Sequence, residues 1–183
     1  GKWPYGATDV EISGMTINQH GGLALGIFNG RGVLLRNMRV NGLLFGQQVE
    51  DVRIEQCVLG DSETTGVQFA DSQAVLVGNF IHDNDHGVTI AGKSEVRLER
   101  NVITRSLFEG VVVTDRARAV LVSNTIAKNG GGIAFLGTSR SGTSPQPRFC
   151  EISSTADSSA ARATPRAWLP WFTNAIGAWA YSA

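Results

Sequence analysis

Carboxylates, cations and imidazoles recur in this 183-residue chain at one place, directly after several short apolar segments. Residues of these three types can together neutralise an acidic group and move a proton beside it. No other part of the chain brings acids, bases and imidazoles together, so these stretches are the candidate site. They are Asn18-Gln19-His20, Asp61-Ser62-Glu63, His82-Asp83-Asn84-Asp85-His86, Thr104-Arg105 with Glu109, and Lys128-Asn129.

If the apolar segments stack, the polar stretches stack with them, about 5 Å apart. Asp61, Asp83, Arg105 and Lys128 would then form a charged column with acids at one end and bases at the other. Such a column suits a uronate, a sugar with a carboxylate, because removing the proton beside that carboxylate requires a nearby base and a neutralising cation. Two other interpretations stay open. Asp61 and Asp83 could serve a glycosidase, and exposed turns are often polar for solubility alone.

The elements that must position these residues are six copies of one pattern within Gly1–Gly137, at intervals of about 19 to 24 residues. The first part of each copy alternates apolar and other residues, which indicates strands. The recurring sets are Val10-Ile12-Met15-Ile17, Val33-Leu35-Met38-Val40, Val52-Ile54-Cys57-Leu59, Val75-Val77-Asn79-Ile81, Val96-Leu98-Asn101-Ile103 and Val120-Val122-Asn124-Ile126.

The second part of each copy is a glycine followed by another alternating segment. The glycine is expected at a bend that requires positive φ. These sets are Gly22-Leu23-Leu25, Gly42-Leu43-Phe45, Gly66-Val67-Phe69, Gly87-Val88-Ile90, Gly110-Val111-Val113 and Gly132-Ile133-Phe135.

The pattern predicts an all-β fold, a right-handed single-stranded parallel β-helix of about six coils, because a fixed period of this length indicates stacked units and no copy has room for a crossover helix. Asn79, Asn101 and Asn124 are expected to stack in one polar file inside it. The copies at 75 and 120 look one residue shorter than the others. In the copy at 75, either Val75 and Val77 or Ala74 and Leu76 point inward; the alternation favours the two valines.

The segments "VRLERNVI", "AVLVSNTIAKNGGGIAF" and "GVQFADSQAVLVGNFIHDNDHGVTI" resemble the parallel β-helix repeat of the pectate-lyase-like superfamily, over roughly residues 8–137. That superfamily includes polysaccharide lyases, polyuronate epimerases, polygalacturonases and NosD-like periplasmic proteins. One fold hosts many chemistries, so the resemblance specifies the fold more than the activity. The paired aspartates and the Gly-His-Gly pattern of polygalacturonases are missing.

The resemblance implies roles for the residues of the column. Asp83 and Asp85, with Asp61 or Glu63, would hold Ca²⁺ through hard oxygen ligands. Arg105 or Lys128 would neutralise the substrate carboxylate or act as the base, and His82 or His86 would be the base or the acid. The residues expected to contact the substrate are Asp61, Glu63 and Glu109.

Two functions from different classes follow. The first is an enzyme acting on an acidic, uronate-containing polysaccharide, of lyase or C5-epimerase type. The second is a non-catalytic carbohydrate-binding or structural β-helix, of NosD-like or adhesin type, which is favoured by the missing catalytic signatures and the small number of coils.

Composition sets further bounds. The formal net charge is zero and no basic face stands out, so nucleic acid is not an expected partner. No apolar run is long enough to span a bilayer. Because the sequence begins Gly1-Lys2-Trp3 without Met, a removed leader and a secreted or periplasmic location are expected. Cys57 is expected inside the solenoid, and the protein is expected to be a monomer.

The repeat ends at Gly137, which divides the chain into a β-helix over 1–137 and different material over 138–183. Thr138–Pro170 is rich in Ser, Thr, Arg, Ala and Pro and is expected to be linker-like. The aromatic-rich segment from Trp168 to Tyr181 could cap the last coil, form a carbohydrate-stacking patch, or be a tail unrelated to the solenoid.

Overall fold

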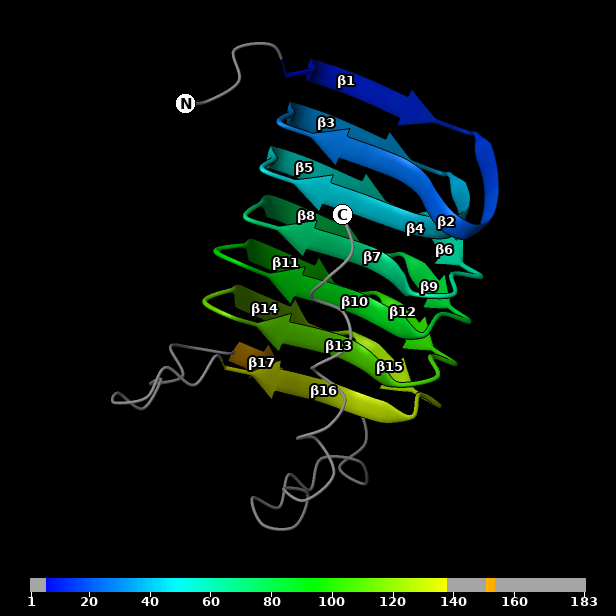
Figure 1. The fold of residues 1–183 in the computed structure, drawn as a ribbon, viewed down its shortest axis with the longest axis vertical. Helices are drawn as coiled ribbons and strands as arrows, with labels where there is room; N and C mark the ends of the chain where they lie inside the picture. The colour runs from blue at the N-terminus through cyan, green and yellow to red at the C-terminus, as the bar shows by residue number, and fades with distance from the viewer. Residues whose placement is uncertain (1–5, 138–150, 154–183) are drawn as a thin grey trace, which may run out of the picture.

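The computed structural model describes residues 6–137 and 151–153, excluding the side chains of His20 and of 151–153. Within these residues the chain winds into a stack of similar coils, each lying below the one before it (Figure 1). All strand pairs are parallel and join equivalent segments of successive coils. The part of the chain described contains no helix long and apolar enough to cross a membrane.

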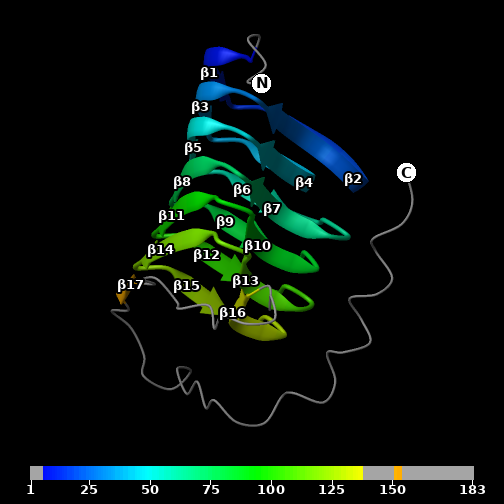
Figure 2. The ribbon, with the colours of Figure 1, turned by 60° about the vertical axis from the view of Figure 1, so that its left-hand side comes forward.

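One side of the solenoid is a seven-stranded sheet with one strand from each coil (Figure 2). Its strands are β1 (Thr8–Ser13), β3 (Arg31–Arg36), β5 (Glu50–Glu55), β8 (Gln73–Val77), β11 (Glu95–Glu99), β14 (Arg118–Val122) and β17 (Glu151–Ser153).

The remaining sides form a ten-stranded sheet that bends along its length. β2 (Thr16–Phe28) and β4 (Arg39–Gln47) run through the bend, and β2 is irregular, with register shifts against β4. In later coils each long strand is replaced by a short one, a turn and a longer one. The short strands are β6 (Val58–Gly60), β9 (Phe80–His82), β12 (Val102–Thr104) and β15 (Thr125–Ala127); the longer ones are β7 (Thr65–Ala70), β10 (His86–Ala91), β13 (Glu109–Thr114) and β16 (Gly131–Leu136).

The core is a set of apolar files that run along the solenoid axis. Leu35, Ile54, Leu76 and Leu98 follow one another in register and are at most 1% exposed. A polar file lies beside them, where the seven-stranded sheet meets the short strands. The side-chain oxygen of Asn101 accepts hydrogen bonds from the backbone N–H and the amide of Asn79, both at 2.9 Å, and Asn124 does the same for Asn101. The predicted asparagine file is confirmed.

Met38 and Cys57 continue the asparagine file as apolar residues, each 2% exposed. The Cys57 backbone N–H donates to the side-chain oxygen of Asn79 at 2.9 Å, which joins the two parts of the file. Burial raises the pKa of the Cys57 thiol. Cys57 is therefore an interior residue, as expected.

The prediction that Val75 and Val77 point inward is wrong. Ala74 and Leu76 are buried and pair in register with Val52 and Ile54. With Ala74 as its first inward residue, this copy has the same spacing as its neighbours, and it looked short only because alanine gives a weak apolar signal. The residue that makes up the spacing is Gly78, which occupies the bend with φ of 64°.

Shifts of one or two residues apply at three other places. Ala119 and Leu121 are buried in the copy that began at Val120. In the first two coils the second strand is also displaced by one or two residues, because Leu25 pairs with Leu44, and Leu44 with Val67. Leu44 is the buried residue there, while Leu43 and Phe45 are half-buried.

Three of the recurring glycines, Gly66, Gly87 and Gly110, serve close packing rather than a left-handed bend. Of the six glycines before the second strands, Gly42 alone has a positive φ. At Gly87 an added Cβ would lie 2.5 Å from Cγ2 of Ile103, and at Gly110 it would lie 2.6 Å from Cγ2 of Ile126. The expectation of positive φ is therefore wrong for five of these six positions. At Gly66, Gly87 and Gly110 the coils approach too closely for a side chain.

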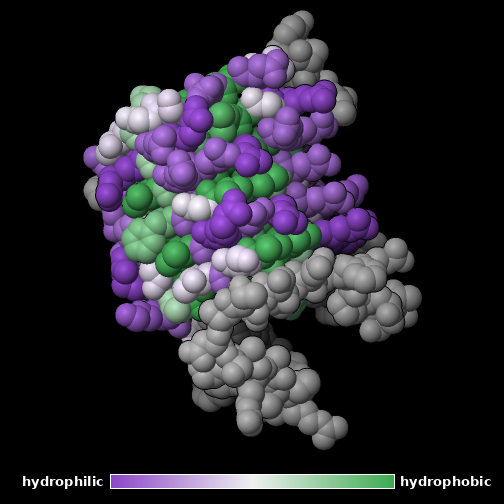
Figure 3. Space-filling view, turned by 180° about the vertical axis from the view of Figure 1, so that it is seen from behind, coloured by the Kyte–Doolittle hydropathy of each residue, from purple (hydrophilic) through white to green (hydrophobic). Residues whose placement is uncertain are grey.

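The outer face of the seven-stranded sheet alternates by coil between charged and apolar rows (Figure 3). Arg53 pairs with Glu55, and Arg97 pairs with Glu99 at 3.2 Å, each within its own strand. Arg118 does reach across, to Glu95 at 3.3 Å. These exposed pairs contribute little stability individually.

In the part expected to be linker-like, Glu151–Ser153 form β17, which extends the seven-stranded sheet by pairing with β14. The proposed aromatic cap and the rest of 138–183 lie outside the described residues.

Candidate functional site

The charged column follows the ends of the short strands. Asp61, Asp83, Arg105 and Lys128 each come directly after one of these strands and share a left-handed backbone, with φ between 54° and 59°. The backbone N–H of Asp83 donates to the carbonyl of Thr104 at 3.3 Å, and that of Arg105 to the carbonyl of Lys128 at 3.1 Å. The four residues therefore lie in one exposed file, the arrangement that the repeat predicted.

Each column residue is followed by a polar residue that anchors the turn and is buried, or half-buried in the case of Asn129. The backbone N–H of Ser62 donates to the side-chain oxygen of Asn84 at 3.0 Å, and that of Ser106 to the side-chain oxygen of Asn129 at 2.8 Å. Because the anchor points inward, the preceding column residue is directed outward. Asn84 and Ser106 are 3% and 4% exposed.

Asp83 and Arg105 form a two-point ion pair between consecutive coils. Nε of Arg105 donates to Oδ1 of Asp83 at 2.8 Å, and Nη2 donates to Oδ2 at 2.6 Å. The Arg105 guanidinium, helped by His82, lowers the pKa of Asp83 to about 2, while the same pair raises the pKa of Arg105. Asp83 is therefore a carboxylate under all ordinary conditions, and Arg105 is held in place.

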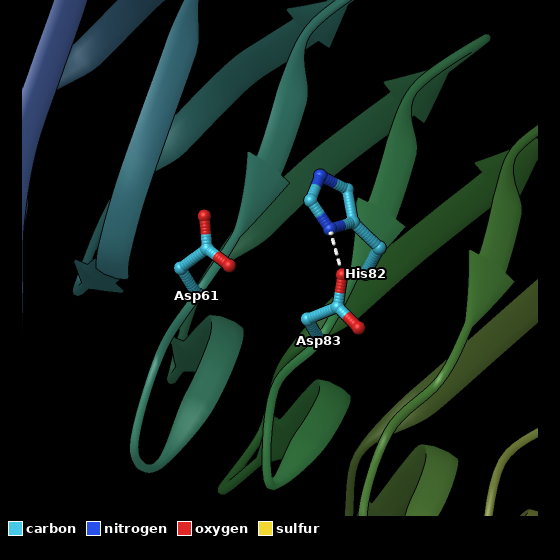
Figure 4. A group of neighbouring side chains, drawn as sticks. All are labelled: Asp61, His82 and Asp83. Atoms are coloured by element: carbon cyan, nitrogen blue, oxygen red, sulfur yellow. Dashed lines mark hydrogen bonds and ion pairs between the residues drawn. The ribbon is translucent and has the colours of Figure 1, made fainter.

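His82 lies beside this ion pair and is largely buried, with 10% of its side chain exposed. Its ring rests over Gly60 of the preceding coil, where an added Cβ would come within 2.8 Å of Cε1. Nδ1 of His82 lies 2.7 Å from Oδ2 of Asp83 (Figure 4). Phe80 packs against the imidazole with ring centroids 4.6 Å apart, and the Arg105 guanidinium lies over the same Phe80 ring.

Asp61, His82 and Asp83 form one group of potential metal ligands, with donor atoms within 4.8 Å of one another. Figure 4 shows the Asp61 carboxylate on the same side of the coils as the His82–Asp83 pair. Asp85, which the resemblance paired with Asp83 as a Ca²⁺ ligand, is not in the group. Ca²⁺ takes six to eight oxygen ligands, waters included, and this group supplies only the carboxylate oxygens of Asp61 and Asp83.

A second imidazole–carboxylate pair lies at the other side of the same turn. Nδ1 of His86 is 3.2 Å from Oε2 of Glu109 on the next coil. The contact is close enough for an ion pair, but its geometry is not that of a hydrogen bond, so Nδ1 has no hydrogen-bond partner within the part of the chain that the structure describes. The His86 ring also stacks on Phe108, with centroids 5.2 Å apart, and about a third of its side chain is exposed.

The remaining predicted residues lie at the margins of the site. Glu63 reaches toward the irregular part of β2, where an added Cβ at Gly21 would be 2.9 Å from its Oε2. Lys128 is exposed at the far end of the column, one coil beyond Arg105. Asn18 bonds to Asn41, whose Nδ2 donates to Oδ1 of Asn18 at 2.8 Å.

Sequence reasoning missed three residues that shape the site. Phe80 and Phe108 supply the ring contacts to the two histidines, and Gly60 makes room for one of them. The available signal was register, because Gly60 aligns with His82 once the repeats are superposed. A glycine opposite a large polar residue marks a place where the side chain lies across the neighbouring coil.

A family model described as a right handed beta helix region matches residues 5–160. No curated protein and no solved structure matches the chain.

Proposed function

Since the chain belongs to the right-handed β-helix family, we propose that it acts on an acidic polysaccharide through uronate lyase or epimerase chemistry at the charged column. One observation supports this most: a fixed guanidinium and an accessible imidazole–carboxylate pair flank a single turn. Asp83, with Arg105 bound to it, begins that turn, and His86 ends it.

Arg105 is the residue that neutralises the substrate carboxylate. Two of its nitrogens are held by Asp83, which fixes the guanidinium plane and leaves Nη1 for a ligand. A guanidinium held in advance loses little freedom when a carboxylate binds, and it stabilises the extra charge that develops when the neighbouring proton leaves.

His86 is the base that removes the proton. It is more accessible than His82, whose side chain is 10% exposed and whose Nδ1 is engaged by Asp83. Glu109 lies at Nδ1 of His86 and Phe108 supports its ring, so Nε2 is the nitrogen left to face a substrate. Closure of the 3.2 Å contact between Glu109 and Nδ1 into a hydrogen bond would hold the proton on Nδ1 and make Nε2 the base.

The proton moves from the sugar carbon to Nε2 of His86. In a lyase, the electrons of the broken C–H bond form a double bond as the neighbouring glycosidic oxygen leaves and takes up a proton from water. In an epimerase, water on the opposite face returns a proton to the same carbon. The lyase and epimerase reactions share this first step, and only the epimerase reaction leaves the polymer intact.

The test is an assay on polygalacturonate and alginate, following the absorbance of unsaturated ends for lyase activity and sugar configuration by NMR for epimerase activity. Arg105→Gln and His86→Gln should each lower the rate at least a hundredfold. Arg97→Gln is a matched control, since Arg97 is also half-exposed and ion-paired but lies on the seven-stranded sheet. Inactivity of the unmodified chain on both polymers by both assays would refute the catalytic proposal.

A non-catalytic carbohydrate-binding β-helix is the second candidate. The turns that carry the column are only three or four residues long between strands in the four coils from β6 to β16. Such short turns build no walls beside the column, and a shallow surface suits binding along a polymer better than enclosing a reaction. Polymer binding that Arg105→Gln weakens, without any chemical change in the polymer, would favour this function.

A further inference from the structure

We infer that Asp61, His82 and Asp83 form a binding site for a transition-type divalent cation such as Zn²⁺, rather than for Ca²⁺. The donors are two carboxylates from consecutive coils and one imidazole, all within 4.8 Å of one another. Mixed oxygen and nitrogen donors of this number suit Zn²⁺, which takes three protein ligands and a water. Ca²⁺ would lack most of its oxygen ligands here.

The imidazole is held in advance for this role. Its ring lies across Gly60, and any side chain at that position would collide with Cε1 and with Nδ1, at 2.8 and 2.9 Å. His82 as a whole residue is 8% exposed, so packing, and not solvent, fixes the orientation of its ring. A ligand fixed in this way requires little reorganisation when the metal binds.

A buried acceptor without a partner lies on the same outward file. Asn41, Gly60 and His82 are register neighbours on successive strands. Nδ2 of Asn41 donates to Oδ1 of Asn18 on the preceding strand. Oδ1 of Asn41, the other end of this amide, is a buried atom in a half-buried residue, and among the described residues it has no hydrogen-bond donor. A metal-bound water would supply the missing donor, since buried acceptors are normally satisfied.

Arg105 has a place in the same arrangement. Nε of Arg105 can stay on Oδ1 of Asp83, while Nη2 would give up its 2.6 Å bond to Oδ2 as Oδ2 turns to the metal. Oδ2 already lies 2.7 Å from Nδ1 of His82. The metal would take the position between these two atoms and release any proton held there to solvent. An outer hydrogen bond of this kind orients a ligating carboxylate.

The experiment titrates the untagged full chain with ZnCl2 by calorimetry and by thermal unfolding, with CaCl2 in parallel. Zn²⁺ should bind one equivalent and raise the unfolding midpoint, and Ca²⁺ at equal concentration should do neither. Asp61→Asn should weaken Zn²⁺ binding about tenfold or more. Asn tolerates the left-handed backbone at this exposed position, so the variant should fold. Glu95→Gln, an ion-paired exposed carboxylate on the seven-stranded sheet, should leave the affinity unchanged.

Three results would overturn the inference: no Zn²⁺ binding, binding that Asp61→Asn leaves intact, or an equal response to Ca²⁺. His82→Gln, checked for folding by circular dichroism, gives an independent second variant that should also lose the site. Zn²⁺ binding does not depend on uronate activity, because His86 and Nη1 of Arg105 are not among the three ligands. Loss of the metal site and loss of the proposed activity can therefore be told apart.

Discussion

At the scale of single residues, the environment of each side chain depends on the coil next to it. The two histidines of one turn illustrate this. His82 is buried because the preceding coil has a glycine opposite it, and His86 is accessible but supported by Phe108 of the following coil. His82 and His86 are close in the sequence, but residues on the preceding and following coils give them different environments.

The Asp83–Arg105 ion pair predicts a specific pH dependence. The folded-state pKa of Asp83 is about 2, below its ordinary value of 3.8, so the carboxylate stabilises the fold above about pH 4. That stabilisation is lost as the pH falls from about 4 toward 2, as Asp83 takes up its proton. Unfolding midpoints of the unmodified chain and of Asp83→Asn should therefore differ at pH 6 and converge at pH 2. A gap that is constant over this range would contradict the pairing.

The buried asparagine file predicts a large loss for a small truncation. Asn101→Ala would leave the Asn79 backbone N–H and the Leu76 carbonyl, both inside the solenoid, without their partners. Each such group costs about 1–3 kcal/mol, so the free energy of unfolding should fall by about 3 kcal/mol. Urea denaturation measures this. Val102→Ala, an exposed change at the adjacent residue, is the control and should cost under about 0.5 kcal/mol.

At the scale of elements, the recurring inward residues of each strand mark one coil of the solenoid. The number and order of the coils could therefore be predicted from the sequence. Stacked strands must bury the same positions in every coil, so Val52-Ile54 and Val96-Leu98 reveal the repeat directly. The frame failed at Ala74 because a small residue can occupy an inward position without appearing apolar. Here the register of the neighbouring coils decides, and register is a property of the pairing rather than of one segment.

The candidate site was predictable to a different degree. Stacking of Asp61, Asp83 and Arg105 followed from the repeat alone, because equivalent positions must coincide. The ligand group that includes His82 did not follow, since its formation depends on the ring lying across Gly60. The expected partner, Asp85, is placed elsewhere by a turn whose course the repeat does not define.

Two glycines that look equivalent in the sequence should respond oppositely to alanine. At Gly87 an added Cβ would lie 2.5 Å from Ile103, and the adjacent backbone cannot move far, so Gly87→Ala should destabilise by about 1–3 kcal/mol. At Gly132 no atom of residues 6–137 lies within 4 Å of the added Cβ, so Gly132→Ala should be neutral or slightly stabilising. Equal effects in denaturant titrations would contradict the close packing inferred between coils.

At the scale of the whole molecule, the solenoid is a sum of coils that contact only their neighbours. The β6–β7 and β12–β13 turns have the same number of residues, although a shorter turn separates them. The coil between them can in principle be removed without changing which side chains point inward. Ala74 and Val96 are equivalent inward positions on successive coils. The deletion must therefore begin and end at equivalent residues of these two strands.

Deletion of Gln73–Ser94 removes one coil and joins Ser72 to Glu95, which keeps Val96 inward opposite Val52. The shortened chain should retain its β-sheet circular dichroism and unfold cooperatively, with a urea m-value lower by roughly one sixth. Deletion of Gln73–Glu95 is the matched control. It shifts the strand by one residue, turns Arg97 toward the core and should abolish cooperative unfolding. Indistinguishable behaviour of the two deletions would argue against the register.

The positions of the column, which share a left-handed backbone conformation, tolerate more types of side chain than the buried positions of the solenoid. Aspartate, arginine and lysine occupy the same backbone conformation along the column and all project into solvent. A residue at one of these positions can be exchanged for another type of residue while the winding beneath it stays the same. Substitutions can therefore accumulate in the column one coil at a time. Related proteins could come to bind different ligands while they keep the same fold.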